Sequence, residues 1–210
     1  MFAVYGLQGH YDASNIKLQM GFWEGTIVHE YVKHVPTRQI LGNQINRVKL
    51  SKYLDKYDYI FWDFDGVIKD TVDIKGDCFK ILFYDFGKNI YNKVYEYHMN
   101  NVGVSRYEKI KIFLSWCNLH SEETLKKYVD QYSKNVMQRV IDSKWFIDAK
   151  NYIINNYNEK IFYLITSTPK KEIDKILYEI NFFKYFYEVL GWPSNKNEAI
   201  KLIIKTNSYE

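Results

Sequence analysis

Hydrophobic runs that end abruptly in polar residues divide most of the chain into strands and helices. The apolar run at 59–62 leads directly into Asp63, and its length and composition are those of a buried parallel strand. The runs at 160–166 and 187–190 have the same character. A helical pattern of apolar residues follows each of the last two runs. This alternation predicts an α/β fold with a doubly wound parallel sheet.

Between the first two strands, the periodicity is that of helices. Four stripes of apolar residues recur at three- and four-residue steps, as one face of a helix requires. The stripes run over residues 79–97, 107–117, 125–140 and 146–157. Ser121, followed by two glutamates, is typical of the start of the third helix. The pattern predicts a small helical bundle inserted between two strands and seated over the sheet.

These patterns assign most of the chain to two structural units. We predict a core formed by residues 55–76 and 158–210, and a helical cap formed by residues 77–157. Residues 1–54 show no long helical stripe and stay unassigned, as a segment of unknown fold or the end of another domain. Two short apolar pieces of this segment are candidate strands, residues 2–5 and 26–28.

The first segment also contains a candidate metal site. His10, Asp12 and either His29 or His34 superficially match the two-histidine, one-carboxylate set that binds non-haem iron. Their separation is short for the strands that such a barrel inserts between its ligands. We therefore interpret the segment as loop-rich and polar rather than as an iron site.

The acid pair Asp63 and Asp65 is the feature around which the predicted core is organised. An extended chain projects both carboxylates toward a common side, and Gly66 can adopt the positive φ of a sharp exit turn. Open α/β sheets place their sites at such strand ends. Asp-Gly is also a common turn signal. An EF-hand is a poor fit, because Val67 and Ile68 stand where a ligand and a glycine are needed.

The other two predicted strands also end in polar groups. The second strand ends at Thr166 and Ser167, and the third leads to Lys196. Thr168 and Pro169 suit the cap and first position of the helix that follows. Phosphoryl transfer needs one carboxylate to attack phosphorus and another to exchange a proton with the leaving group. A hydroxyl, backbone N–H groups and a positive charge then hold the phosphoryl oxygens.

These residues resemble the motifs of the haloacid dehalogenase superfamily. Asp63-Phe64-Asp65-Gly66-Val67 is similar to its first motif, Thr166 to its second and Lys196 to its third. The helical segment lies between the first two motifs, as in members with a helical cap such as phosphoglycolate phosphatase. Residues 98–109 are similar to a cap segment of bacterial sugar-pathway members. The resemblance covers about residues 57–205 and implies a Rossmann-like core with an inserted helical cap.

The resemblance also implies roles for individual residues. Asp63 is the expected nucleophile, and Asp65 the expected general acid and then base. Thr166, Ser167 and Lys196 are the expected phosphate ligands. Mg²⁺ is expected to bridge Asp63 and the phosphate, and Asp65 to bind it through its backbone carbonyl.

Two further expectations concern the cap and the end of the chain. Arg106 and Lys109, three residues apart on a cap helix, are the expected substrate contacts. The family's fourth motif, an acidic pair after a further apolar strand, has no counterpart after Lys196, as in a chain cut short. We therefore expect weak Mg²⁺ binding and slow or no turnover. The strand of Asp63 is then left at a sheet edge unless residues 1–54 or another chain cover it.

The sequence thus predicts a Mg²⁺-dependent phosphomonoester hydrolase of a small phosphorylated metabolite, such as a sugar phosphate, with an aspartyl-phosphate intermediate. One alternative is a truncated or inactive binding module of the same fold. Another is a metal-dependent glycosyltransferase that uses Asp63-Phe64-Asp65.

Composition narrows the choice of partners. The net charge of +4 is spread along the chain and does not indicate a nucleic-acid partner. No apolar run approaches the roughly 18 residues of a membrane span. Cys78 and Cys117 are too few for a disulfide framework, which favours a cytoplasmic protein.

Overall fold

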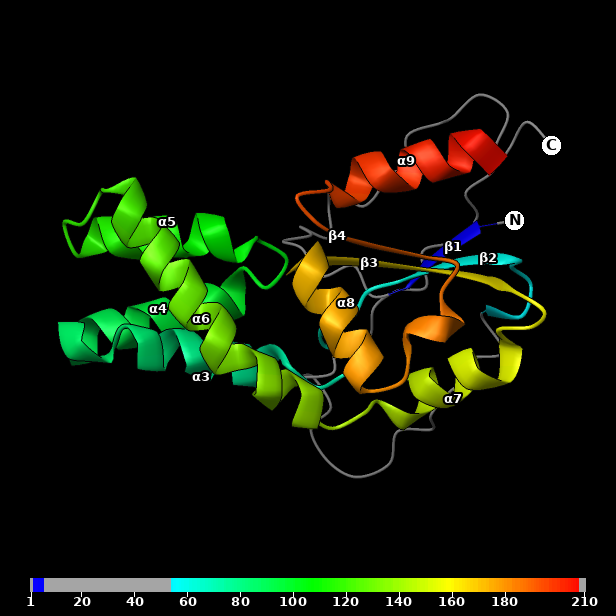
Figure 1. The fold of residues 1–210 in the computed structure, drawn as a ribbon, viewed down its shortest axis with the longest axis horizontal. Coiled ribbons are helices and arrows are strands. Elements are labelled where there is room, and N and C mark those ends of the chain that lie inside the picture. The colour runs from blue at the N-terminus through cyan, green and yellow to red at the C-terminus, as the bar shows by residue number, and fades with distance from the viewer. Residues whose placement is uncertain (1, 6–53, 208–210) are drawn as a thin grey trace.

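The computed structural model describes residues 2–5 and 54–207 and arranges them as a sheet with helices on both faces and a helical bundle beside it (Figure 1). The strands are β1 (Phe2–Tyr5), β2 (Tyr59–Trp62), β3 (Ile161–Pro169) and β4 (Glu188–Trp192). The helices are α3 (Val72–Leu82), α4 (Lys88–Asn100), α5 (Arg106–Trp116), α6 (Glu122–Asp142), α7 (Ile147–Asn156), α8 (Lys170–Glu179) and α9 (Lys196–Asn207). Two 3₁₀ turns are η1 (Tyr84–Phe86) and η2 (Phe183–Tyr185).

The four described strands form one parallel sheet in the order β1-β2-β3-β4. Trp62, the last residue of β2, pairs with Tyr5 on one side and Leu164 on the other. The carboxyl ends of the strands therefore meet at one edge, as the sequence predicts. The strand that carries Asp63 is not an edge strand, because β1 covers the side on which it would be exposed.

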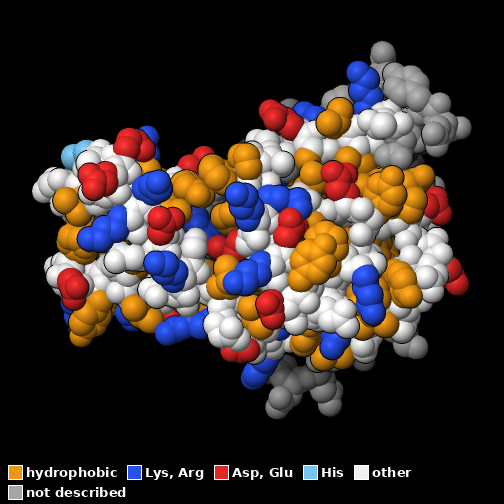
Figure 2. Space-filling model, in the orientation of Figure 1, with side chains coloured by type: hydrophobic (Ala, Val, Ile, Leu, Met, Phe, Trp, Pro, Cys, Tyr) orange, Lys and Arg blue, Asp and Glu red, His pale blue; other side chains and the backbone are white. Residues whose placement is uncertain are grey.

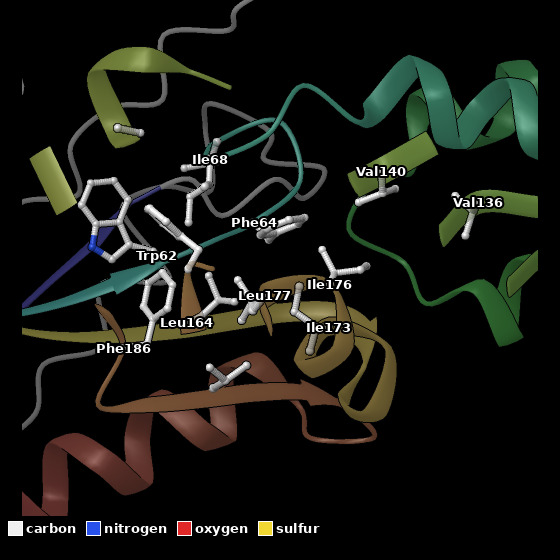
Figure 3. Packing of buried hydrophobic residues seen from close by; sticks show 14 of the residues in the cluster. Trp62, Phe64, Ile68, Val136, Val140, Leu164, Ile173, Ile176, Leu177 and Phe186 are labelled. Atoms are coloured by element: carbon white, nitrogen blue, oxygen red, sulfur yellow. The ribbon is translucent and has the colours of Figure 1, made fainter. Parts of the chain in front are cut away.

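Side-chain alternation along the central strands determines which helices cover which face. Trp62 and Leu164 point to the face covered by α7 and α8, where they pack in one cluster with Leu177 (Figure 3). Phe61 and Tyr163 point to the opposite face and stack with ring centroids 5.0 Å apart. Helix α9 covers this second face. Helices on both faces of a parallel sheet confirm the predicted α/β class.

The helical bundle is formed by α3, α4, α5 and α6 and stands to one side of the sheet (Figure 1). Its centre is aromatic, with the Phe79 ring 4.0 Å from the Tyr132 ring and 5.5 Å from the Phe113 ring. These three side chains are buried. We call this bundle the cap, because it lies between β2 and β3 in sequence and beside the carboxyl ends of both strands.

Two expectations about the cap helices need correction. The stripe at 79–97 does not form one helix, because α3 and α4 are separate and Gly87, at φ +87°, stands at the break. The stripe at 146–157 forms α7, but this helix packs on the sheet rather than in the bundle. Its Tyr152 ring lies 5.9 Å from the Trp62 ring of β2. Amphipathic spacing reports that a face is buried, but not against which partner.

The two linkers between core and cap are held together. The backbone N–H of Asp70 donates to the carbonyl of Lys144 at 2.9 Å. The buried ammonium of Lys69 donates to the carbonyls of Ile141 (3.0 Å) and Ser143 (2.5 Å), where α6 ends. A cation at a helix C-terminus also complements the helix dipole. These bonds fix the start of the cap close to Asp65.

Some sequence-based predictions lie outside the described residues. These are the strand at 26–28 and the iron-site candidates His10, Asp12, His29 and His34. The prediction of a strand at residues 2–5 is confirmed by β1. Among residues 2–5 and 54–207, no helix combines the length and apolar character needed to cross a membrane.

Candidate active site

Asp63 stands directly after β2 and is only 5% exposed. Its Oδ1 accepts a hydrogen bond from the backbone N–H of Phe64 at 2.8 Å. Its Oδ2 accepts one from Lys196 Nζ at 2.8 Å, from the first residue of α9. Burial raises the pKa of Asp63, and the charge of Lys196 opposes that shift. The structure thus brings the first and third predicted motifs into direct contact.

Asp65 is held by three donors. Thr71 Oγ1 donates to its Oδ1 at 2.6 Å, while Lys75 Nζ (2.6 Å) and Thr168 Oγ1 (3.3 Å) donate to its Oδ2. Lys75 also donates to Thr168 Oγ1 at 2.8 Å. Burial favours a higher pKa, but the charge and hydrogen bond of Lys75, with the bond from Thr71, outweigh it and leave the pKa of Asp65 below its usual value. Asp65 is therefore a carboxylate at neutral pH in this arrangement.

Thr71 and Lys75 are site residues that sequence reasoning missed. Helix α3 begins right after the acidic loop, and the backbone N–H of Lys75 donates to the carbonyl of Thr71 at 2.9 Å. Residues four apart lie on one helix face, so both side chains turn back toward Asp65. A threonine and a lysine four residues apart just behind Asp-x-Asp-Gly form the sequence signal that could have pointed to them.

The second predicted motif lies at the end of β3. Thr166 is buried, and its Oγ1 accepts a hydrogen bond from the N–H of Thr168 at 3.2 Å. Ser167 Oγ donates across the cleft to the carbonyl of Gly103 in the cap at 2.8 Å. Helix α8 begins at Lys170 after Pro169, so the expectation that Thr168 caps this helix is wrong. Thr168 instead joins Asp65 and Lys75.

The expected substrate contacts Arg106 and Lys109 both lie on α5, but they have different partners. Arg106 makes a bidentate ion pair with Glu172 of α8, at 2.5 and 2.7 Å, and also donates to Ser133 Oγ at 2.8 Å. Both charged side chains are almost fully buried. Arg106 therefore ties the cap to the core, because its guanidinium already has a carboxylate partner.

Lys109 is 2% exposed and pairs with a histidine instead of an acid. Its Nζ lies 3.1 Å from His98 Nδ1 and donates to the carbonyl of Val102 at 3.3 Å. His98 Nε2 lies 3.1 Å from the carbonyl of Val72, so Nε2 carries the proton and Nδ1 accepts from Lys109. Burial and the charge of Lys109 lower the pKa of His98 to about 3. Burial and the charge of Lys75 lower the pKa of Lys109 to about 7.

A pocket lies between these cap residues and the acid pair. It is lined by Asp65, Val72, Lys75, Phe79, His98, Val102, Val104, Arg106, Lys109, Tyr132, Ser167 and Thr168. Figure 2 shows basic and acidic side chains gathered where the cap meets the core. The sequence-predicted residues Asp65, Ser167, Arg106 and Lys109 thus share one cavity. Asp63, after β2, and its partner Lys196, at the start of α9, do not line it.

The buried pair of Arg106 and Glu172 gives a stability prediction. Removing one partner leaves an uncompensated buried charge, so Arg106→Met is expected to lower the free energy of unfolding by about 3–5 kcal/mol. Replacing both residues with methionine is expected to recover much of that loss. Urea unfolding measures both changes.

The matched control is Lys170→Met, which removes a more exposed i,i+4 pair between Lys170 and Asp174 of α8. Exposed pairs contribute about 0–1 kcal/mol, so this variant is expected to unfold almost like the parent chain. If Arg106→Met were no more destabilising than the control, the ion pair would not hold the cap to the core.

The acid pair fits a magnesium ion in donor chemistry. Carboxylate and carbonyl oxygens are the ligands that Mg²⁺ prefers, and one or two carboxylates with substrate phosphate and water are often enough. Asp63 and Asp65 provide such oxygens at one strand end. Within residues 2–5 and 54–207, no third acid, histidine or cysteine joins them in a cluster. Asp70, the nearest further acid of the loop, is exposed.

Comparison with known proteins adds information about the fold. No family model matches the chain, and no curated protein matches it. Solved structures do match. A protein of Bacteroides fragilis described as a haloacid dehalogenase-like hydrolase aligns with a TM-score of 0.57 at 17% identity, over 72% of this chain and 73% of that chain.

Two more solved structures give the same result. A protein of Clostridium difficile described as a phosphatase aligns with a TM-score of 0.51 at 21% identity, over 72% of this chain and 70% of that chain. A predicted phosphoglycolate phosphatase of Haemophilus somnus aligns with a TM-score of 0.52 at 12% identity, over 72% of each chain. The chain therefore has the fold of haloacid dehalogenase-like hydrolases, a parallel-sheet core with an inserted helical cap.

Proposed function

We propose that the chain is a Mg²⁺-dependent phosphomonoester hydrolase of a small phosphorylated metabolite, and that it acts through an aspartyl-phosphate. The observation that carries this proposal is the 2.8 Å ion pair of Lys196 with Asp63, next to Asp65. This pair places a fixed cation next to the carboxylate that would attack phosphorus. It also lies close to a second carboxylate, Asp65, that can transfer a proton. The phosphatase descriptions of structural neighbours support the same activity.

In the first half of the reaction, an oxygen of Asp63 forms a bond to phosphorus while the ester P–O bond breaks. The departing alkoxide takes a proton from Asp65. In the second half, Asp65 accepts a proton from water as the water oxygen bonds to phosphorus and the bond to Asp63 breaks. Mg²⁺, held by the Asp63 carboxylate and the Asp65 backbone carbonyl, would neutralise phosphate charge.

The surroundings of Asp65 suit the second half best. Because Lys75 keeps Asp65 ionised, the carboxylate is ready to act as a base. For the first half, Asp65 has to take up a proton as substrate displaces Lys75. Thr166, Ser167 and the N–H groups at the start of α8 are the proposed phosphate donors, with Lys196.

The alternatives are weighed by two observations. The described part of the chain offers only two acids as metal ligands, which favours an inactive binding module. A glycosyltransferase built on Asp63-Phe64-Asp65 is not favoured, because it gives no role to the contact between Lys196 and Asp63. The free thiols of Cys78 and Cys117 support the proposal of a cytoplasmic enzyme.

Aryl-phosphate hydrolysis as a function of Mg²⁺ tests the proposal. We expect slow phosphate release that requires Mg²⁺ and stops with a chelator. It should saturate only at high Mg²⁺, because Asp63 and Asp65 are the only protein ligands identified among residues 2–5 and 54–207. Calorimetry is expected to show weak Mg²⁺ binding.

Two outcomes would change this view. A folded chain that releases no phosphate at any Mg²⁺ concentration would establish the inactive module. Tight Mg²⁺ binding with fast turnover would show that a further acid completes the site.

A further inference from the structure

Among the residues that the structure describes, the charged side chains around the pocket are paired with opposite charges, with one exception. Three cations each have a carboxylate partner within 2.8 Å: Lys75 with Asp65, Arg106 with Glu172, and Lys196 with Asp63. Lys109 lines the same pocket and has no acidic partner among the residues that the structure describes. A buried ammonium without a counter-charge is costly in a folded protein, so this lysine needs another explanation.

The contacts of Lys109 hold its ammonium in place and leave donor capacity for a ligand. An ammonium carries three N–H donors, and His98 and the Val102 carbonyl account for two of them. The proton on His98 Nε2 is directed to the Val72 carbonyl, so the ring can only accept from Lys109. The site is therefore a cation fixed by neutral groups, which is what an anion-binding group in a buried pocket requires.

The position of Lys109 indicates which part of a substrate it meets. Asp65 and Ser167 line the core side of the pocket, and Lys109 lines the cap side. In the proposed reaction the phosphoryl group sits at Asp63, so the alcohol portion of the ester points to the cap. The apolar walls include Phe79 and Val104, so they offer contacts to carbon atoms but no counter-charge.

We propose that the substrate is a phosphate monoester whose alcohol portion carries a second anionic group, a carboxylate or a phosphate, and that Lys109 binds this group. The inference rests on the proposed hydrolase function and names its substrate class. A neutral sugar hydroxyl can accept a hydrogen bond from Lys109 but supplies no charge. A charge-assisted hydrogen bond is stronger and corresponds to about 10–100-fold in affinity.

The electrostatics of the pocket support this proposal. Burial lowers the pKa of Lys109 most, and the charges of Lys75 and Arg106 lower it further. The charges of Asp65 and Glu108 raise it too little to compensate, so the pKa is about 7. A bound anion acts in the opposite direction and restores the charged form. Without a bound anion, the folded protein loses this proton above about pH 7, whereas the unfolded chain keeps it up to about pH 10.4. The free energy of unfolding is therefore expected to rise between about pH 7 and pH 10.

The test compares Lys109→Met with Lys111→Met, an exposed lysine on the same helix. The substrates are the phosphate ester of a two-carbon hydroxy acid, propane-1,3-diol bisphosphate and the neutral 2-hydroxyethyl phosphate. We expect kcat/KM of the parent chain to favour one of the two acidic esters over the neutral one by about 10–100-fold. Which acidic ester is preferred distinguishes carboxylate from phosphate. Lys109→Met is expected to lose this preference, whereas Lys111→Met is expected to keep both the preference and the rates of the parent chain.

An equal preference in the parent chain and in Lys109→Met would overturn the inference. If no ester, including an aryl phosphate, is hydrolysed, the proposed function fails, and binding decides the inference by itself. Calorimetry on the Asp63→Asn chain then compares acidic and neutral esters with and without Lys109→Met. Equal affinities would refute an anion site, and a preference that depends on Lys109 would support it.

Folding of the variant is checked independently. Methionine matches the length of the lysine stem and removes a buried charge, so Lys109→Met is expected to be at least as stable as the parent chain at pH 7. The pH-dependent rise in stability between about pH 7 and pH 10 is expected to be smaller in this variant. If the methionine variant does not fold, Lys109→Gln replaces it in the same comparisons.

Discussion

Asp63→Asn is expected to lower aryl-phosphate hydrolysis by at least about 10⁴-fold, because a neutral amide is a poor nucleophile toward phosphorus. The substitution is nearly isosteric, and the amide oxygen can still accept a hydrogen bond from the N–H of Phe64 or from Lys196. The loss would therefore report on chemistry rather than on folding. Release of inorganic phosphate over time measures it.

Asp70→Asn is the matched control for that substitution. It makes the same chemical change in the same loop, but the side chain is exposed and does not line the pocket. We expect it to keep the parent rate. Mass spectrometry of the acid-quenched parent chain should find phosphate on Asp63. An Asp63→Asn chain that keeps most of its activity would rule out this residue as the nucleophile.

Asp65→Asn is expected to slow the reaction by about 10²–10⁴-fold, the usual contribution of a general acid–base group. Asparagine keeps an acceptor for Thr71 and Lys75 but can neither donate the proton to the alkoxide nor accept one from water. Both halves of the reaction should therefore be affected. Steady-state rates and single-turnover phosphorylation of the enzyme separate the two halves.

The choice of ester sharpens this second prediction. An aryl leaving group departs with little help from an acid, whereas an alkyl leaving group needs a proton. Asp65→Asn should therefore slow the phosphorylation half more for alkyl esters than for aryl esters. The dephosphorylation half should be slowed equally for both, because the aspartyl-phosphate is the same. A change below about threefold in every step, far under the expected range, would remove Asp65 from the mechanism.

The sequence determined the features that depend on neighbouring residues. Runs of buried residues that end in polar ones located β2, β3 and β4, and helical stripes located the cap helices α5 and α6. Asp63 and Asp65 could be assigned to a strand end because both follow one apolar run. The N-cap at Ser121 was predicted for the same reason, and its hydroxyl accepts from the N–H of Thr124 at 3.0 Å.

The partners of these residues were decided only by the tertiary structure. The contact of Lys196 with Asp63 joins residues 133 positions apart, and the pair of Arg106 with Glu172 joins residues 66 positions apart. No local pattern distinguishes an arginine that binds substrate from one that ties a cap to a core. That distinction depends on which helix lies opposite, and so on how the layers pack.

The same limit applies to the two details that matter most for the site. Lys75 reaches Asp65 because the start of α3 turns Thr71 and Lys75 back toward the acidic loop, and only the tertiary structure shows this orientation. Lys109 is without a carboxylate in the described part of the chain because α4 presents His98 there and the loop after α4 presents the carbonyl of Val102. The sequence determined which groups the protein has for chemistry. The packing of cap on core decided which charged groups pair with each other, and which cation faces the pocket without a counter-charge from the residues that the structure describes.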